Sequence, residues 1–274
     1  MSADSPPGTH VVAALLALAA ALLCRAWLQV TLETGGFDRT LAANLSYLVV
    51  PPVLLVLLLP VLRADRGFLC ALLRPGPVNL RLLLVAAAIG LLLRVAWWSQ
   101  LVASVSFGWQ SSTDPLAIVG PVARFSCPPA ASMAAGIVVA TLLIPPIEEL
   151  IHRGYVQTRL HSRGPALAIT ISTLLFVVFH PTSGWGFALA GGAVLGTMYW
   201  TSGSLWPPIV THSVVNLEPQ ITWRCLNLHW NPTADTLPLW SVGLPATLVF
   251  CLSAGLVAWL ALAKCGRRDP VPAP

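Results

Sequence analysis

Long apolar runs, broken by short polar stretches, make up most of this chain. Three of them lie in the N-terminal part, at residues 11–30, 45–62 and 80–98, and one lies near the C-terminus, at 237–263. A helix that crosses a bilayer needs about 20 apolar residues, so each run predicts a transmembrane helix. No Lys or Arg precedes the first run and no convincing cleavage site follows it, so we expect a retained helix and not a signal peptide.

Three further runs are apolar but too short to cross a bilayer, at residues 132–147, 165–179 and 205–215. Each of them ends against polar residues or contains them. To span the membrane, these helices must continue through the polar residues, the first of them to about residue 160. The pattern therefore predicts polar side chains at membrane depth.

Residues 185–200 complete the set of predicted helices, and Ala188, Gly192 and Gly196 recur in them at four-residue spacing. A row of small residues lets two helix backbones approach closely, and we interpret this row as tight packing only. The count reaches eight, so the predicted fold class is all-α, a polytopic membrane protein with about eight transmembrane helices. Residues 99–131 are mildly polar and are expected to form a loop outside the membrane.

Composition and charge support this class. Only 9% of the residues are charged and 56% are hydrophobic, whereas a soluble domain carries about 25% charged residues. The net charge of +5 does not indicate nucleic-acid binding, because the basic residues are scattered, and the short loops at 63–81 and 159–163 and the tail at 264–268 contain most of them. With eight helices these segments share one side, which the positive-inside rule makes cytoplasmic. We expect membrane lipids as partners and both termini in the cytoplasm. Arg outnumbers Lys fourteen to one, with Lys264 the only lysine; this ratio is typical of a GC-rich bacterial genome, so we expect a bacterial inner membrane.

The strongest chemical signal is an ionisable cluster between apolar segments: Glu148, Glu149, His152 and Arg153. Ionisable residues inside a membrane protein are expensive, so they form a functional-site hypothesis by default. Glu149 and Arg153 are four residues apart and can pair on one helix face. Glu148 points about 100° away from that face, so it is predicted to face a cavity.

Two later helices are predicted to bring polar residues to the same depth. His180 lies on the fifth helix, and His212 and Asn216 share a face of the seventh. A carboxylate beside a histidine can hold a water molecule and take its proton, and a histidine N–H with an asparagine amide can stabilise an oxyanion. No G-x-S-x-G motif is present, so this set favours hydrolysis by direct attack of water.

These motifs, in this order, resemble one known family. Glu148-Glu149-x-x-x-Arg153-Gly154, then Phe176-x-x-x-His180, then His212-x-x-x-Asn216 are similar to the CAAX-protease and bacteriocin-processing (CPBP, or Abi) intramembrane proteases. The resemblance covers about residues 131–217, which would be the protease core of one integral membrane domain. Residues 1–130 would add three helices and an extracytoplasmic loop, and 218–274 a loop, the last helix and a basic cytoplasmic tail. The family usually has an aromatic residue where this chain has His152.

The resemblance implies a role for each residue. Glu148 and His180 would activate the water, His212 and Asn216 would form the oxyanion site, and Glu149 with Arg153 would orient them. It implies a glutamic-type peptidase without a cofactor. A divalent metal such as zinc is the alternative, since two histidines and the glutamates could bind one, although no H-E-x-x-H motif is present.

The expected substrate is a protein or peptide, lipidated or membrane-anchored, that is cut near its C-terminus or anchor, as in bacteriocin processing or the myxosortase branch. A proton-coupled transporter is an alternative, because buried Glu and His residues also build proton relays. A transporter needs polar groups along a complete path, and the sequence indicates them at one depth only. A non-catalytic membrane scaffold is the third alternative, and the complete motif set disfavours it.

The remaining candidates carry weaker signals. Phe176 is expected to serve packing alone. Three further histidines are expected at interfaces or in loops and not as ligands: His152, His161 and His229. The six cysteines form no C-x-x-C pair, which disfavours a cysteine metal site, and a bridge between Cys127 and Cys225 would be compatible with extracytoplasmic loops.

Overall fold

The computed structural model of the chain describes residues 8–73, 78–107, 130–180, 184–220 and 239–263, and all regular elements in these segments are helices. The α-helices are α1 (Gly8–Thr34), α2 (Arg39–Ser46), α3 (Val50–Ala64), α4 (Arg66–Leu72), α5 (Leu80–Ser106), α6 (Ala130–Gly136), α7 (Ile144–Glu149), α8 (Pro165–Val178), α9 (Trp185–Ser202), α10 (Trp206–Gln220) and α11 (Leu244–Ala263). Shorter helical elements are η1 (Tyr47–Val49), η3 (Ile137–Leu143), η4 (Leu150–Gln157), η5 (His161–Arg163) and η8 (Leu239–Gly243). The all-α class is confirmed.

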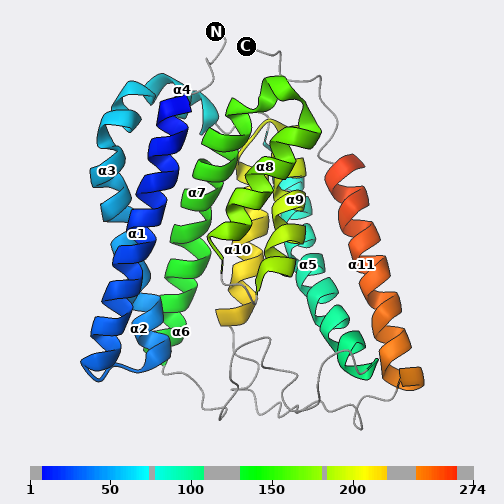
Figure 1. Cartoon of the computed structure of the whole chain (residues 1–274). Helices are drawn as coiled ribbons and strands as arrows, with labels where there is room; N and C mark the ends of the chain where they lie inside the picture. The colour runs from blue at the N-terminus through cyan, green and yellow to red at the C-terminus, as the bar shows by residue number, and fades with distance from the viewer. Residues whose placement is uncertain (1–7, 74–77, 108–129, 181–183, 221–238, 264–274) are drawn as a thin grey trace.

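Five helices in the described part of the chain are long and apolar enough to cross a membrane. Their bounds are Gly8–Thr34, Leu41–Ala64, Leu80–Ser104, Ala130–Gln157 and Trp240–Ala261. A multi-pass membrane protein is therefore supported, while the count of eight stays a prediction. The start of α1 and the end of α11 lie at the same end of the bundle (Figure 1), as an even number of passes requires. Which side of a membrane this end faces also stays a prediction.

The helices α8 and α9 form a hairpin, and both are shorter than α1 and α5, which have 27 residues each. The 14 residues of α8 are about 21 Å long, whereas the hydrocarbon core of a bilayer is about 30 Å thick. Figure 1 shows both helices ending well short of the lower ends of α1 and α5. α8 therefore ends, and α9 begins, within the bundle (Figure 1).

His180 follows α8, so its predicted position inside the fifth helix is wrong. The last turn tightens, because the amide of Phe179 bonds to the carbonyl of Phe176 at 3.3 Å and that of His180 to Val177 at 2.9 Å. The next residue in the sequence is Pro181, which has no amide N–H and disfavours the helical conformation of the residue before it. The proline thus explains why the helix ends before the histidine.

The fourth predicted helix is one continuous rod, Ala130–Gln157. It contains two π-helical segments, η3 and η4, on either side of the short α7. Pro145 and Pro146 lie in the first turn of α7 and cannot donate backbone hydrogen bonds, so the regular pattern cannot run through them. Isolated π-helical turns are frequent at functional sites.

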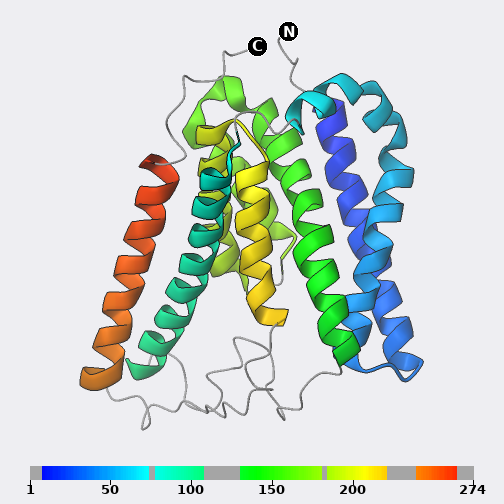
Figure 2. The ribbon, with the colours of Figure 1, turned by 180° about the vertical axis from the view of Figure 1, so that it is seen from behind.

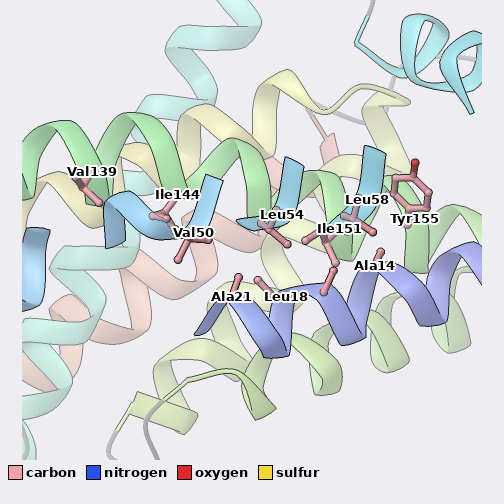
Figure 3. Packing of buried hydrophobic residues seen from close by; sticks show 11 residues of the cluster. Ala14, Leu18, Ala21, Val50, Leu54, Leu58, Val139, Ile144, Ile151 and Tyr155 are labelled. Atoms are coloured by element: carbon pink, nitrogen blue, oxygen red, sulfur yellow. The ribbon is translucent and has the colours of Figure 1, made fainter. Parts of the chain in front are cut away.

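Two groups of buried residues hold this rod in place. On one side, apolar side chains of α1, α3 and the rod interdigitate (Figure 3). On the other side, α10 lies between the rod and α5 (Figures 1 and 2). A Cβ added at Gly90 on α5 would lie 2.8 Å from the carbonyl oxygen of Thr211, and the Thr211 hydroxyl donates to the carbonyl of Ala86 at 2.7 Å. This close crossing fixes the position of the next residue on α10, His212, along the axis of the bundle.

Two expectations need comment. The N-terminal apolar run is an integral helix of the bundle, since Ala14, Leu18 and Ala21 of α1 are part of its buried core. The expected loop 99–131 starts later than predicted, because α5 continues to Ser106. Residues 108–129 lie outside the described part, and so do Cys127 and Cys225, whose pairing stays a prediction.

Candidate active site

Glu149 and Arg153 form the buried centre of the site. The Arg153 Nε lies 3.2 Å from Glu149 Oε2, and both side chains are completely buried. The four-residue spacing predicts this pair, and the prediction is confirmed. Arg153 also donates from Nη2 to the carbonyl of Gly192 on α9 at 3.0 Å, and its guanidinium lies 4.8 Å from the centre of the Phe176 ring.

His212 links the two glutamates. Its Nδ1 lies 2.8 Å from Glu149 Oε1, and its Nε2 lies 3.7 Å from Glu148 Oε2. A carboxylate can only accept, so Nδ1 carries the proton in the first contact. That bond fixes the ring orientation and directs Nε2 toward Glu148.

Glu148 and Glu149 are neighbours in sequence but differ in environment. The Glu149 side chain is 0% exposed and has Arg153 and His212 as partners. The Glu148 side chain is 16% exposed, and its only close charged partner among the described residues is His212, at 3.7 Å. Glu148 is therefore the carboxylate that a water molecule or a substrate can reach, as the helix geometry predicts.

His180 is held with one ring nitrogen available. Its Nδ1 donates to the carbonyl of Phe176 at 2.8 Å, because a carbonyl oxygen can only accept. Its own carbonyl accepts a hydrogen bond of 3.0 Å from the indole of Trp185. In this tautomer Nε2 carries no proton and can act as a base.

Phe176 is the side chain that joins these groups. Its ring centre lies 4.4 Å from that of His180 and 5.6 Å from that of His212, while Arg153 lies over its face. The ring is buried, which agrees with the expectation that Phe176 serves packing. Its neighbours, however, are the functional side chains from three different elements, which gives Phe176 a positioning role that the sequence does not reveal.

Asn216 lies on α10 with its amide tied to the rod. Its Nδ2 donates to the carbonyl of Ala140 at 3.0 Å. In η3 the amide of Ile144 bonds to Val139, so the next amide in this pattern, that of residue 145, would serve Ala140. Residue 145 is a proline and has no N–H. Pro145 thus leaves free the carbonyl that holds Asn216, and the second amide N–H of Asn216 remains available to a substrate.

His152 is buried inside the site, so its predicted interfacial or loop position is wrong. It is 1% exposed, and its Nδ1 donates to the carbonyl of Glu148 at 2.8 Å. Its ring lies edge-to-face with those of Phe176 and Phe179, with ring centres 5.2 and 5.9 Å away. The physical reason is that η4 is buried on opposite sides at once, by α1 and α3 and by α8 and α9.

His161 lies in η5 beyond the rod and stacks on Trp200 at 4.0 Å, and partial burial lowers the pKa of His161. His229 lies outside the described residues.

The prediction that polar groups occur at one depth only is wrong. On α1, Arg25 donates to Gln29 at 3.2 Å and Gln29 donates to Glu33 at 2.8 Å, so a bonded polar row continues to the far end of that helix. The guanidinium of Arg25 lies over the ring of Tyr47. The signal for this row was present in the sequence, as polar residues at four-residue spacing within an apolar run.

The fit of a metal ion can be tested on the donors present. Among the described residues, no group of three or more His, Cys, Asp or Glu side chains has the arrangement of a metal site. His212 Nδ1 is engaged with Glu149 and His180 Nδ1 with a carbonyl. Nε2 of each ring is left as a donor, but a zinc site needs at least three protein ligands, and these two histidines belong to no such group among the residues described.

Part of the chain matches a known family. Residues 130–217 match the family described as type II CAAX prenyl endopeptidase Rce1-like. This segment contains all the motif residues described above, from Glu148 to Asn216. No curated protein and no solved structure matches the chain significantly.

Proposed function

We propose, from the premise that residues 130–217 are an Rce1-like domain of the CPBP (Abi) family, that the chain hydrolyses peptide bonds within the membrane by water that Glu148 and His180 activate. The family supports an intramembrane peptidase in general terms. The observation that carries the glutamic mechanism is the difference between the two glutamates: Glu149 is enclosed and paired, whereas Glu148 is reachable and has no cation of its own among the described residues.

In the proposed first step, a water molecule at Glu148 loses a proton to the carboxylate while its oxygen attacks the scissile carbonyl carbon. General base catalysis of this kind contributes about 10²–10⁴-fold to a rate. His180 Nε2, free of a proton, accepts a hydrogen bond from the second O–H of the water, which stays on the oxygen, and so fixes the orientation of the water. The carbonyl oxygen becomes an oxyanion, and the C–N bond then breaks as the protonated carboxyl of Glu148 returns its proton to the leaving amine.

The oxyanion would be stabilised by the free amide N–H of Asn216 and by His212 when its Nε2 carries a proton. Both groups are held before the substrate arrives, Asn216 by the carbonyl of Ala140 and His212 by Glu149. Donors that need no reorganisation during the reaction stabilise developing charge well. Glu149 and Arg153 act through His212 and Phe176, so they are positioning residues and do not touch the substrate.

The proposed substrate is a lipidated or membrane-anchored protein or precursor peptide, cut near its C-terminus or anchor. Two features support this class: the family description refers to prenylated CAAX ends, and the site lies inside a bundle of apolar helices. The turn after α8 adds a third argument. Non-helical backbone at membrane depth occurs where it is buried in protein or lines a water-filled cavity, and His180 lies in that turn.

The test is the replacement Glu148→Gln, which keeps the shape of the side chain and removes its basicity. We expect cleavage of a prenylated CAAX-type peptide by the purified protein to fall by about 10²–10⁴-fold. Glu33→Gln on α1 is the matched control and should keep more than half of the activity, and His180→Ala should resemble Glu148→Gln. A metal chelator should leave the rate unchanged. Full activity of the Glu148→Gln protein would refute the mechanism, and inhibition by the chelator would refute the metal-free form of it.

The cellular substrate can be sought with the same variant. In the source organism, a strain with Glu148→Gln should accumulate proteins whose C-termini are longer than in the parent strain, measured by mass spectrometry of C-terminal peptides. Proton-coupled uptake by vesicles that contain the protein would instead support the transporter alternative.

A further inference from the structure

The ring of His152 is buried in the rod, and the proposed reaction does not use it. The residue is 1% exposed. Its Nδ1 donates to the carbonyl of Glu148 at 2.8 Å, so Nε2 of the neutral ring carries the lone pair. Nε2 is buried without a hydrogen-bond partner among the described residues. The ring thus makes one hydrogen bond, and its acceptor is the backbone of the residue to which we assign the general base.

This hydrogen bond crosses a change in helix type. Glu148 belongs to α7, whereas His152 belongs to the π-helical segment η4. Backbone hydrogen bonds join residues four apart in an α-helix and five apart in a π-helix. A side-chain N–H that binds the carbonyl of Glu148 from η4 holds the two segments in one relative orientation. The direction of the Glu148 side chain follows from that orientation.

His152 also holds α8 against the rod. The Ser172 hydroxyl donates to the backbone carbonyl of His152 at 2.8 Å, and Ser172 is completely buried. The rings of Phe176 and Phe179 lie edge-to-face with the His152 ring, at centre distances of 5.2 and 5.9 Å, an arrangement that aromatic pairs favour. The three partners follow one another at spacings of four and three residues, which places them on one side of the α8 segment.

The end of α8 supports His180. The carbonyl of Phe176 accepts the hydrogen bond from His180 Nδ1 at 2.8 Å and a second one from the amide of Phe179 at 3.3 Å. The two phenylalanines that contact the His152 ring are therefore the residues that place His180. A shift of the His152 ring would change the position of His180 relative to Glu148.

We propose that His152 is a positioning residue of the peptidase, whose ring sets the separation between Glu148 and His180, the two residues that hold the attacking water. The proposal rests on the proposed function of these two residues. An apolar ring in the same place would still pack against α8, but it could not bind the carbonyl of Glu148. Misplacement of a reacting group by about 1 Å can lower a rate by about 10²-fold, so a small change in this separation is sufficient to slow the reaction.

The first experiment separates the ring from its hydrogen bond. His152→Phe keeps an aromatic ring without the N–H, so kcat for a prenylated CAAX-type peptide should fall by about 10- to 100-fold. KM should stay within about twofold, because the lost interaction acts in the transition state and not in substrate binding. His161→Phe, the same replacement at a stacked ring outside the site, is the matched control and should leave kcat unchanged.

A second pair of variants isolates the hydrogen bond in the absence of the ring. His152→Asn and His152→Leu have nearly the same shape, and only the asparagine retains a donor near the position of Nδ1. The kcat of His152→Asn should be about 3- to 10-fold higher than that of His152→Leu, which corresponds to one hydrogen bond. Equal kcat values for the two variants would overturn the proposal.

A double-mutant cycle tests whether the effect passes through His180. When His180→Ala is already present, His152→Phe should lower the residual kcat by less than about threefold, because the separation from Glu148 no longer matters. A residue that only stabilises the fold would lower kcat by the same factor with and without His180. Ser172→Ala, which loosens α8 from the His152 carbonyl, should lower kcat by about 3- to 10-fold with KM unchanged.

Several results would overturn the proposal. A His152→Phe protein with wild-type kcat would do so, and so would equal effects in the two His180 backgrounds, or a rise in KM at unchanged kcat. If His152→Phe fails to fold in detergent, the comparison of His152→Asn with His152→Leu and the kcat of Ser172→Ala decide by the same criteria. None of these results touches the peptidase function itself, which full activity of the Glu148→Gln protein would refute.

Discussion

The two sides of η4 are built in opposite ways. On the side of α1 and α3, Ile151 and Tyr155 pack into an apolar cluster with alanines and leucines (Figure 3). On the side of α9, Arg153 donates to the carbonyl of Gly192 at 3.0 Å, and Gln157 donates to that of Gly196 at 2.8 Å. The first side is held by apolar packing. The second is held by two hydrogen bonds, whose donors are four residues apart on η4 and whose acceptors are four residues apart on α9.

The difference teaches which contacts give a membrane site its geometry. Lipid tails are as apolar as leucine, so apolar packing alone specifies the rotation of a helix weakly. Hydrogen bonds between fixed partners permit one register only. The catalytic motif therefore obtains its orientation from the α9 side, and the row of small residues does more than allow close packing, because it exposes the carbonyls that Arg153 and Gln157 need.

The largest effect is expected from Arg153→Met. It removes the hydrogen bond from Arg153 to Gly192 and leaves the enclosed carboxylate of Glu149 without its cation. Breaking a buried ion pair in this way costs about 3–5 kcal/mol. Thermal unfolding in detergent micelles should show the loss, together with loss of cleavage. Adding Glu149→Gln should recover part of the stability, whereas Arg159→Met should change little. A single Arg153→Met protein as stable as the wild type would contradict the role assigned to the pair.

A smaller effect is expected from Gly192→Ala. The added Cβ would lie 2.9 Å from Thr173 Cγ2 and 3.4 Å from Phe176 Cδ1, and overpacking of this kind costs about 1–3 kcal/mol. Because either Thr173 or the α9 backbone, which includes the carbonyl bound by Arg153, must shift to relieve the 2.9 Å contact, kcat should fall while the fold is retained. Gly191→Ala is the neighbouring control, with no atom within 4 Å of the added Cβ; it should be neutral or stabilising by up to about 1 kcal/mol. Equal behaviour of the two variants would mean that the α9 side does not orient the site.

The smallest effect on activity is expected from Leu18→Ala on the apolar side. Leu18 is 2% exposed, and its truncation leaves a cavity that should lower stability by about 1–2 kcal/mol, below the usual range for soluble proteins because the alternative environment is lipid. The rate of cleavage at 25 °C should stay within about twofold of the wild type. Leu16→Ala, at a position 66% exposed, serves as the control. A loss of kcat larger than that of Gly192→Ala would reverse the comparison.

The parts of the site that the sequence predicts are those that depend on spacing along one helix. Glu149 and Arg153 pair because four residues make nearly one turn, and Glu148 is more accessible because it points away from that pair. The family motifs also follow directly from residue order. None of these inferences depends on which helices are neighbours in the fold.

The parts that the sequence does not predict depend on packing or on missing backbone donors. His152 is buried because η4 has neighbours on opposite sides, which no local pattern records. Asn216 is held by a carbonyl that Pro145 leaves free, and this follows only from the π-helical pattern of η3. Arg25 faces inward because of the partners of α1, and in the sequence it is one charge in an apolar run.

The short α8–α9 hairpin has a consequence for the surrounding lipid. α8 exposes Leu167, Leu174 and Val178 on its outer surface, yet its length is about 9 Å less than the thickness of a hydrocarbon core. A bilayer adapts to a hydrophobic segment that is too short by thinning next to it. Lipid headgroups and their water would then stand closer to His180 than in a bilayer of full thickness, so a polar peptide backbone that arrives from the side would cross less hydrocarbon before it reaches Glu148.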